Sequence, residues 1–155
     1  DNVTEAGDLI QIILPAGAFV TTLVLKDWQG SKEFLLGGGT SLVAVHGIKH
    51  LSGVGRPDES TYNSFPSGHT AAAFYGPAFI HRRYGWKYAA PLYFAAMYVG
   101  YSRVYANRHW ADDVLAGATL SMVWNWYFTT PYAEKVTVTP VLGRDCYGLS
   151  VEFSF

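Results

Sequence analysis

Residues 114–133 read VLAGATLSMVWNWYFTTPYA, a run of twenty residues without Asp, Glu, Lys or Arg. Such a run is typical of an apolar helix. Three further runs lack these charges in the same way: Leu9 to Leu25, Phe34 to Ile48 and Tyr88 to Ser102. A fifth helix is predicted from Gly68 to about Arg83. Turn-rich segments connect the runs, so the sequence predicts an all-α fold, a compact bundle of about five helices.

The C-terminal segment has a different periodicity. Alternate residues from Leu149 to Phe155 are apolar, which is the two-residue period of a β-strand. Val136 to Leu142 is also rich in β-forming residues, and a turn over 143–148, which contains the single cysteine Cys146, separates the two segments. We therefore expect one domain over 1–155, with a helical core over about 8–133 and a short β-hairpin over about 136–155.

The composition excludes several classes of protein. Half of the residues are hydrophobic and 15% are charged, whereas about 25% is usual, so intrinsic disorder is excluded. The net charge of −1 leaves no electrostatic basis for nucleic-acid binding, and we expect no nucleic-acid partner. The mean hydropathy of +0.10 lies between the values usual for soluble and for membrane proteins.

Polar residues gather in three clusters at the ends of the predicted helices. The first reads Lys-x6-Arg-Pro from Lys49 to Pro57. The second is Pro-Ser-Gly-His, residues 66–69, and the third reads Ser-Arg-x5-His-x3-Asp from Ser102 to Asp113. Polar side chains at helix ends in such an apolar chain indicate a functional site.

The first cluster offers two cations. Lys49 ends an apolar helix, where a positive charge is favourable beside the negative end of the helix dipole. Arg56 precedes Pro57, which favours an extended backbone, and a guanidinium matches the oxygens of a phosphate in a bidentate way. The alternatives are that Lys49 only caps its helix and that Arg56 only forms a surface ion pair.

The second cluster lies at the start of a predicted helix, which Ser64 or Ser67 could cap. A helix N-terminus also presents free backbone N–H groups to an anion, and Gly68 allows the backbone to approach that anion closely. His69 would then stand in the first turn, where it could donate a proton to a leaving oxygen.

In the third cluster, His109 and Asp113 are four residues apart, so on a helix they would share a face. A carboxylate that holds one imidazole nitrogen leaves the other free to act as nucleophile or base. Asp112 satisfies the spacing as well, and the alternative is an exposed His–Asp pair at a helix start. Arg103 lies one short loop before His109, and we expect the two to face each other.

His46 and His50 have the spacing of a His-Glu-x-x-His metal motif. The residue after His46 is Gly47, so the glutamate base is missing, and no third ligand is evident. We expect no catalytic metal and no other cofactor.

Taken together, the three clusters resemble the type 2 phosphatidic acid phosphatase superfamily, which also includes bacterial class A acid phosphatases and vanadium haloperoxidases. Every element of the family pattern is present, in order and at the family spacing. The resemblance spans Lys49 to Asp113, and the helical bundle agrees with the family's fold.

The resemblance implies a role for each matched residue. His109 would attack phosphorus and become phosphohistidine, Asp113 would orient it, and His69 would protonate the leaving alkoxide and then activate water. The phosphate would be bound by five residues: Lys49, Arg56, Ser67, Gly68 and Arg103. No metal is implied, because Lys and Arg supply the positive charge that stabilises the transferring phosphoryl group.

The function expected from this resemblance is the hydrolysis of phosphomonoesters or pyrophosphates, with a lipid phosphate as the substrate. The alternatives are a vanadate-dependent haloperoxidase, an acid phosphatase for soluble phosphomonoesters, and a non-catalytic phosphate-binding module. The abundance of Trp and Tyr favours a membrane surface as a partner. Nothing in the sequence predicts an oligomeric state.

The expected location is the bacterial cell envelope, in the periplasm. Two of the apolar runs reach the length of a membrane-spanning helix, about 17–25 residues. Cations gather at the end of the bundle opposite the three clusters, as the positive-inside rule expects: Lys26, Lys32, Arg82, Arg83, Lys87 and Lys135. The modest hydropathy and the Gly and Pro interruptions nevertheless favour a compact soluble or peripheral protein. An integral inner-membrane protein with its active site facing the periplasm is the alternative.

Overall fold

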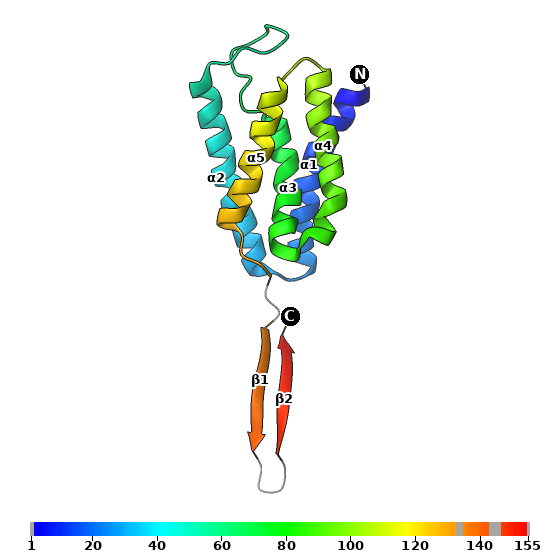
Figure 1. Ribbon diagram of the computed structural model, residues 1–155, viewed down its shortest axis with the longest axis vertical. Helices are drawn as coiled ribbons and strands as arrows, with labels where there is room; N and C mark the ends of the chain where they lie inside the picture. Colours follow the sequence, from blue (N-terminus) through cyan, green and yellow to red (C-terminus); the bar gives the residue numbers. More distant parts are fainter. Residues whose placement is uncertain (1, 133–134, 143–146, 155) are drawn as a thin grey trace.

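The computed structural model describes residues 2–132, 135–142 and 147–154. Its helices are α1 (Asn2–Val24), α2 (Trp28–Ser52), α3 (Gly68–Tyr84), α4 (Trp86–Tyr105) and α5 (Ala111–Phe128), and they lie side by side as a bundle (Figure 1). Within the described residues, the prediction of an all-α core of five helices is confirmed.

The outermost helix ends differ from those predicted. The first helix begins at Asn2 rather than near residue 8, because its first turns are polar and so lie outside the uncharged run from Leu9 to Leu25. The last helix ends at Phe128 rather than at 133. Thr129 has extended dihedral angles, φ −116° and ψ 125°, and Pro131 disfavours a helical conformation for the residue before it.

Two strands follow the helices, β1 (Lys135–Leu142) and β2 (Tyr147–Ser154). They pair antiparallel, with Lys135 opposite Ser154 and Leu142 opposite Tyr147. The predicted turn between them falls largely on residues 143–146, and these, with Cys146, lie outside the described residues.

Helix α3 is the centre of the bundle and contacts each of the other four helices (Figure 1). Most of its residues are buried, including Tyr75 and Phe79. Phe34 of α2 packs edge-on against both rings, at 5.1 Å and 5.0 Å between centroids. Such aromatic pairs contribute about 0.5–1.5 kcal/mol beyond the area that they bury, so they fix the position of α2 against α3.

A buried ion pair holds the end of the bundle at which α3 ends. Arg83 of α3 donates from Nη2 to Asp27 Oδ1 at 2.6 Å and from Nε to Asp27 Oδ2 at 2.7 Å. The same guanidinium donates to the carbonyl of Thr130 at 2.8 Å. These bonds join the α1–α2 turn, the end of α3 and the segment after α5.

Helix α5 packs closely against the start of α3 at Gly117. A Cβ atom at this position would lie 2.5 Å from the carbonyl oxygen of Ser67 and 3.2 Å from the backbone nitrogen of Ala71. Both are backbone atoms of α3 or of its N-cap, so they cannot turn away as a side chain would. Gly117 therefore brings the start of α5 against the Pro-Ser-Gly-His segment.

We expect Gly117→Ala to lower the free energy of unfolding by about 1–3 kcal/mol, as overpacking does in other cores. Gly17 is the matched control, because it lies inside α1 and a Cβ there would meet nothing within 4 Å. Gly17→Ala should leave stability unchanged or raise it by about 0.5–1 kcal/mol. Thermal unfolding of both variants measures the difference, and equal effects would contradict the close contact at Gly117.

Candidate active site

The three sequence clusters meet at one end of the bundle (Figure 1). This end is formed by the last turn of α2, the long connection over 53–67, the start of α3 and the turn between α4 and α5. The connection folds back onto α2, because Lys49 Nζ donates to the carbonyl of Asn63 at 2.9 Å. The last turn of α2 therefore orders the segment that precedes the Pro-Ser-Gly-His residues.

His109 lies in the α4–α5 turn and is 3% exposed. Its Nδ1 atom is 3.4 Å from Oδ2 of Asp113, whereas Asp112 is exposed. The sequence suggested that the two residues share a helix face. They do not, because α5 begins only at Ala111, after His109. Asp113 caps its own helix by accepting a hydrogen bond from the backbone N–H of Trp110 at 2.8 Å. The cap holds the carboxylate toward His109.

Ser64 is a third member of this group that the sequence did not predict. It is fully buried, its hydroxyl donates to Oδ2 of Asp113, and its Oγ is 3.4 Å from Nδ1 of His109. In the sequence Ser64 was only a possible helix cap. The cap of α3 is instead Ser67, whose Oγ accepts from the backbone N–H of Thr70 at 3.4 Å.

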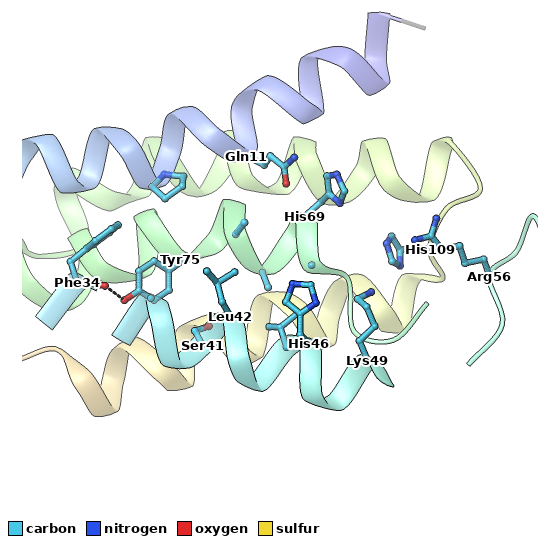
Figure 2. Close-up of a pocket in the computed structure, with 16 residues that line it drawn as sticks. Gln11, Phe34, Ser41, Leu42, His46, Lys49, Arg56, His69, Tyr75 and His109 are labelled. Carbon is cyan, nitrogen blue, oxygen red and sulfur yellow. Dashed lines mark hydrogen bonds between the residues drawn. The ribbon is translucent and has the colours of Figure 1, made fainter. Parts of the chain in front are cut away.

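A cavity of about 500 Å³ opens beside this group. Five of the eight predicted site residues line it: Lys49, Arg56, Gly68, His69 and His109 (Figure 2). Lys49 comes from α2, Arg56 from the 53–67 connection and His109 from the α4–α5 turn. The fold thus brings two cations and two imidazoles from four segments to one end of a single cavity.

Arg56 carries an unused donor at this position. Among the residues whose side chains are described, its Nε is the one buried side-chain nitrogen or oxygen without a hydrogen-bond partner. Buried polar groups are nearly always satisfied, so an unsatisfied guanidinium N–H beside a cavity requires an explanation. A bound anion would satisfy it.

The remaining predicted residues lie around the cavity rather than in its wall. Ser67 is fully buried as the cap of α3, and its backbone N–H donates to the carbonyl of Asp113 at 2.9 Å. Arg103, which is 3% exposed, is directed at α1 rather than at His109. It donates from Nη1 to Asp8 Oδ1 at 2.7 Å and from Nη2 to the carbonyl of Thr4 at 2.9 Å.

Asp8 was not predicted from the sequence. It directly precedes the apolar run that begins at Leu9, and no motif includes it. In the structure its Oδ1 is also 3.4 Å from Nε2 of His69, so one carboxylate contacts both a predicted cation and a predicted acid.

The charges around His109 favour its neutral form. Burial lowers the pKa of His109 to about 4, the cations Lys49 and Arg56 act in the same direction, and Asp113 opposes them. The imidazole is therefore uncharged at pH 7. With Asp113 at Nδ1, the proton of the neutral ring is favoured on that atom, which leaves the lone pair of Nε2 available for attack.

A metal site is not evident in the part of the chain with described side chains, where no three His, Cys, Asp or Glu residues come together. His46 lines the cavity without such partners. The expectation of a metal-free reaction stays a prediction.

The titration of His109 can be followed by NMR in histidine-labelled protein. We expect a midpoint of about 4 in the wild type, a higher midpoint in Lys49→Met, which loses a nearby cation, and a lower one in Asp113→Asn, which loses the opposing carboxylate. Asp112→Asn is the matched control and should leave the midpoint unchanged. An unchanged midpoint in both Lys49→Met and Asp113→Asn would contradict this electrostatic arrangement.

Comparisons with known proteins agree with the motifs. Residues 32–136, more than half of the chain, match the PAP2 superfamily. The lipid A 4'-phosphatase of Helicobacter pylori is 31% identical over an alignment that covers 97% of this chain and 83% of that protein. The lipid A 1-phosphatase of Porphyromonas gingivalis is 43% identical over 82 residues, which cover 51% of this chain and only 18% of that longer protein.

Among solved structures, the crystal structure of Aquifex aeolicus LpxE superposes with a TM-score of 0.70 at 23% identity. The match covers 81% of this chain and 82% of that chain, so the helical fold is shared. The phosphatase that the motifs predicted is confirmed by the relatives, and the chain belongs to the PAP2 superfamily.

Proposed function

We propose that this chain is a metal-independent lipid phosphatase that transfers a phosphoryl group first to His109 and then to water. One observation carries this proposal: a single cavity has cations and imidazoles at one end and apolar walls at the other. Beyond Lys49 and His109 the lining continues with Pro15, Phe34, Leu42, Val45 and Tyr75, from α1, α2 and α3 (Figure 2). A phosphorylated molecule with a hydrocarbon chain would match both ends of the cavity, its phosphate at the cationic end and its chain at the apolar end.

The relatives favour the same class of substrate. Two curated relatives are named as phosphatases of lipid A, at its 4' and its 1 position. We therefore infer that the substrate is a phosphorylated lipid of the outer layers of a bacterium. The soluble esters hydrolysed by an acid phosphatase have no hydrocarbon chain that would contact the apolar half of the cavity.

In the first step of the proposed reaction, Nε2 of His109 attacks phosphorus as the bond from phosphorus to the substrate oxygen breaks. His69 gives its proton to the departing oxygen, so the product leaves as an alcohol. In the second step a water oxygen attacks phosphorus, its proton passes to His69, and the bond from phosphorus to His109 breaks. Inorganic phosphate is released and both imidazoles return to their starting states.

The cations of the site supply the stabilisation that a metal gives in other phosphatases. Lys49 and Arg56 line the cavity that would hold the phosphoryl oxygens, and the buried Nε of Arg56 has no hydrogen-bond partner. The backbone N–H of Gly68, at the first residue of α3, adds a donor at a helix N-terminus. Ser67 contributes by capping that helix, and Arg103 by holding α1 against the site.

The outer surface of the bundle supports a membrane location. Helix α1 is long and apolar enough to cross a membrane by length and composition. Large apolar side chains are exposed on α1, α2, α4 and α5, among them Ile12, Leu36, Phe94, Leu115 and Tyr127. This surface favours the integral alternative over the soluble or peripheral protein that the hydropathy suggested, because monomeric soluble proteins rarely expose large contiguous apolar patches.

We infer an orientation in which Lys49, His69 and His109 lie at the membrane surface on the periplasmic side of the bacterial envelope. At the opposite end Lys26, Lys32 and Lys87 are exposed, as expected for a cytoplasmic side. Arg83, which the sequence counted with these cations, is buried in its ion pair with Asp27. We further propose that the helices and the C-terminal strands form one phosphatase domain over 1–155.

The proposed function is tested by comparing a lipid phosphate with p-nitrophenyl phosphate in the presence of EDTA. The wild type should hydrolyse both. Leu42→Trp narrows the apolar half of the cavity, so it should lower kcat/KM for the lipid about 10-fold or more and leave p-nitrophenyl phosphate nearly unchanged.

Val43 is the matched control, because it follows Leu42 on α2, is 74% exposed and does not line the cavity. Val43→Trp should leave both activities unchanged. Equal effects of Leu42→Trp on the two substrates would show that the apolar half does not bind the lipid. Loss of activity with EDTA would contradict the metal-independent mechanism.

A further inference from the structure

Asp8 joins the first helix to the active site. Its Oδ1 is 2.7 Å from Nη1 of Arg103 and 3.4 Å from Nε2 of His69. The close approach of α1 requires Gly7, because a Cβ there would overlap the hydroxyl of Ser102 and lie 2.9 Å from Nη2 of Arg103. The first turns of α1 therefore place a carboxylate beside Arg103 and His69.

The proposed reaction requires a proton on His69 when the substrate oxygen leaves. Burial lowers the pKa of the His69 imidazole, and the charged groups that act on it are Arg103 from α4, Asp8 from α1, Lys49 from α2 and Arg56 from the 53–67 connection. Three of these are cations, which disfavour a protonated imidazole, and Asp8 is the anion that favours it. Without Asp8, the cations that bind a phosphate dianion would also favour loss of the proton that His69 must donate.

We propose that Asp8 is the positioning carboxylate of His69, in the way that Asp113 is the carboxylate of His109. The proposal rests on the phosphatase function proposed above. Asp8 accepts the Nε2–H of the protonated ring, so Nδ1–H is the donor left for the departing oxygen. The same carboxylate pairs with the guanidinium of Arg103 at 2.7 Å and so offsets the charge of one cation that acts on His69.

The geometry gives the two carboxylates different surroundings. Asp113 is 1% exposed and accepts a backbone N–H, whereas the side chain of Asp8 is 49% exposed. Asp113 is therefore a fixed part of the fold, while Asp8 can be replaced by the isosteric amide with little effect on folding. An amide oxygen still accepts the hydrogen bond from Arg103, but it carries no charge to hold a proton on His69.

The test compares Asp8→Asn with two substrates that differ in the leaving group. An alkoxide needs a proton as it departs, whereas p-nitrophenolate does not. We expect Asp8→Asn to lower kcat for hexadecyl phosphate about 10- to 100-fold, with a change of less than about 3-fold for p-nitrophenyl phosphate. The alkaline limb of the kcat profile for hexadecyl phosphate should move to lower pH, because His69 loses its proton more easily.

Asp112→Asn, the same charge change at an exposed position, is the control and should alter neither substrate nor profile. No change in Asp8→Asn would overturn the proposal. An equal loss on both substrates with a raised KM would overturn it as well, since Asp8 would then act through Arg103 on phosphate binding.

A second measurement does not depend on turnover. NMR titration of His69 in the substrate-free protein should show its midpoint at lower pH in Asp8→Asn than in the wild type, with the midpoint of His109 unchanged. An unshifted His69 would overturn the pairing. If the wild type hydrolysed neither substrate, the proposed function would fail, and this titration would still decide whether Asp8 and His69 are coupled.

Discussion

The active-site end of the bundle depends on the contacts of one buried carboxylate, Asp113. Its Oδ2 accepts the backbone N–H of Trp110 and the hydroxyl of Ser64, and it faces Nδ1 of His109. Its own carbonyl accepts the backbone N–H of Ser67. A buried charge is stable only when such partners surround it, so the start of α5, the 53–67 connection and the cap of α3 are held in one arrangement. The positions of the nucleophile and of the phosphate-facing helix N-terminus follow from that arrangement.

Charge is divided across the site in a way that suits phosphoryl transfer. Lys49 and Arg56 face the cavity, where they disfavour the protonated form of His109 and attract an anion. The carboxylates stand behind the imidazoles, Asp113 behind His109 and Asp8 behind His69. Burial and the cations keep His109 neutral, whereas Asp8 opposes the burial and the cations that lower the pKa of His69. The apolar walls beyond Lys49 then determine which phosphates enter.

Much of this could be predicted from the sequence, because four of the five helices overlap the long uncharged runs and the three motifs have fixed spacings. The helix ends could not be predicted in this way, since the first turns of α1 are polar. The roles of Asp8 and Ser64 in the site could not be predicted either. Each residue acts through a contact between segments far apart in the chain, and nothing in the local sequence indicates the partner. The spacing of His109 and Asp113 predicted the correct pair, but the predicted geometry was wrong. His109 lies before the start of α5 and Asp113 lies in its first turn, so the two do not share a helix face. Arg103 was expected to face His109, and only the packing of α1 shows that its guanidinium is directed at Asp8.

The central claim is that His109 is the nucleophile and that Asp113 leaves its Nε2 atom free to attack. The most direct measurement is rapid quenching of the enzyme at alkaline pH during turnover of a ³²P-labelled lipid phosphate, followed by peptide mapping and NMR of the phosphorylated residue. We expect one phosphate on Nε2 of His109 and none in His109→Ala. Phosphate on Nδ1 of His109, phosphate on His69, or full turnover by His109→Ala would contradict the claim.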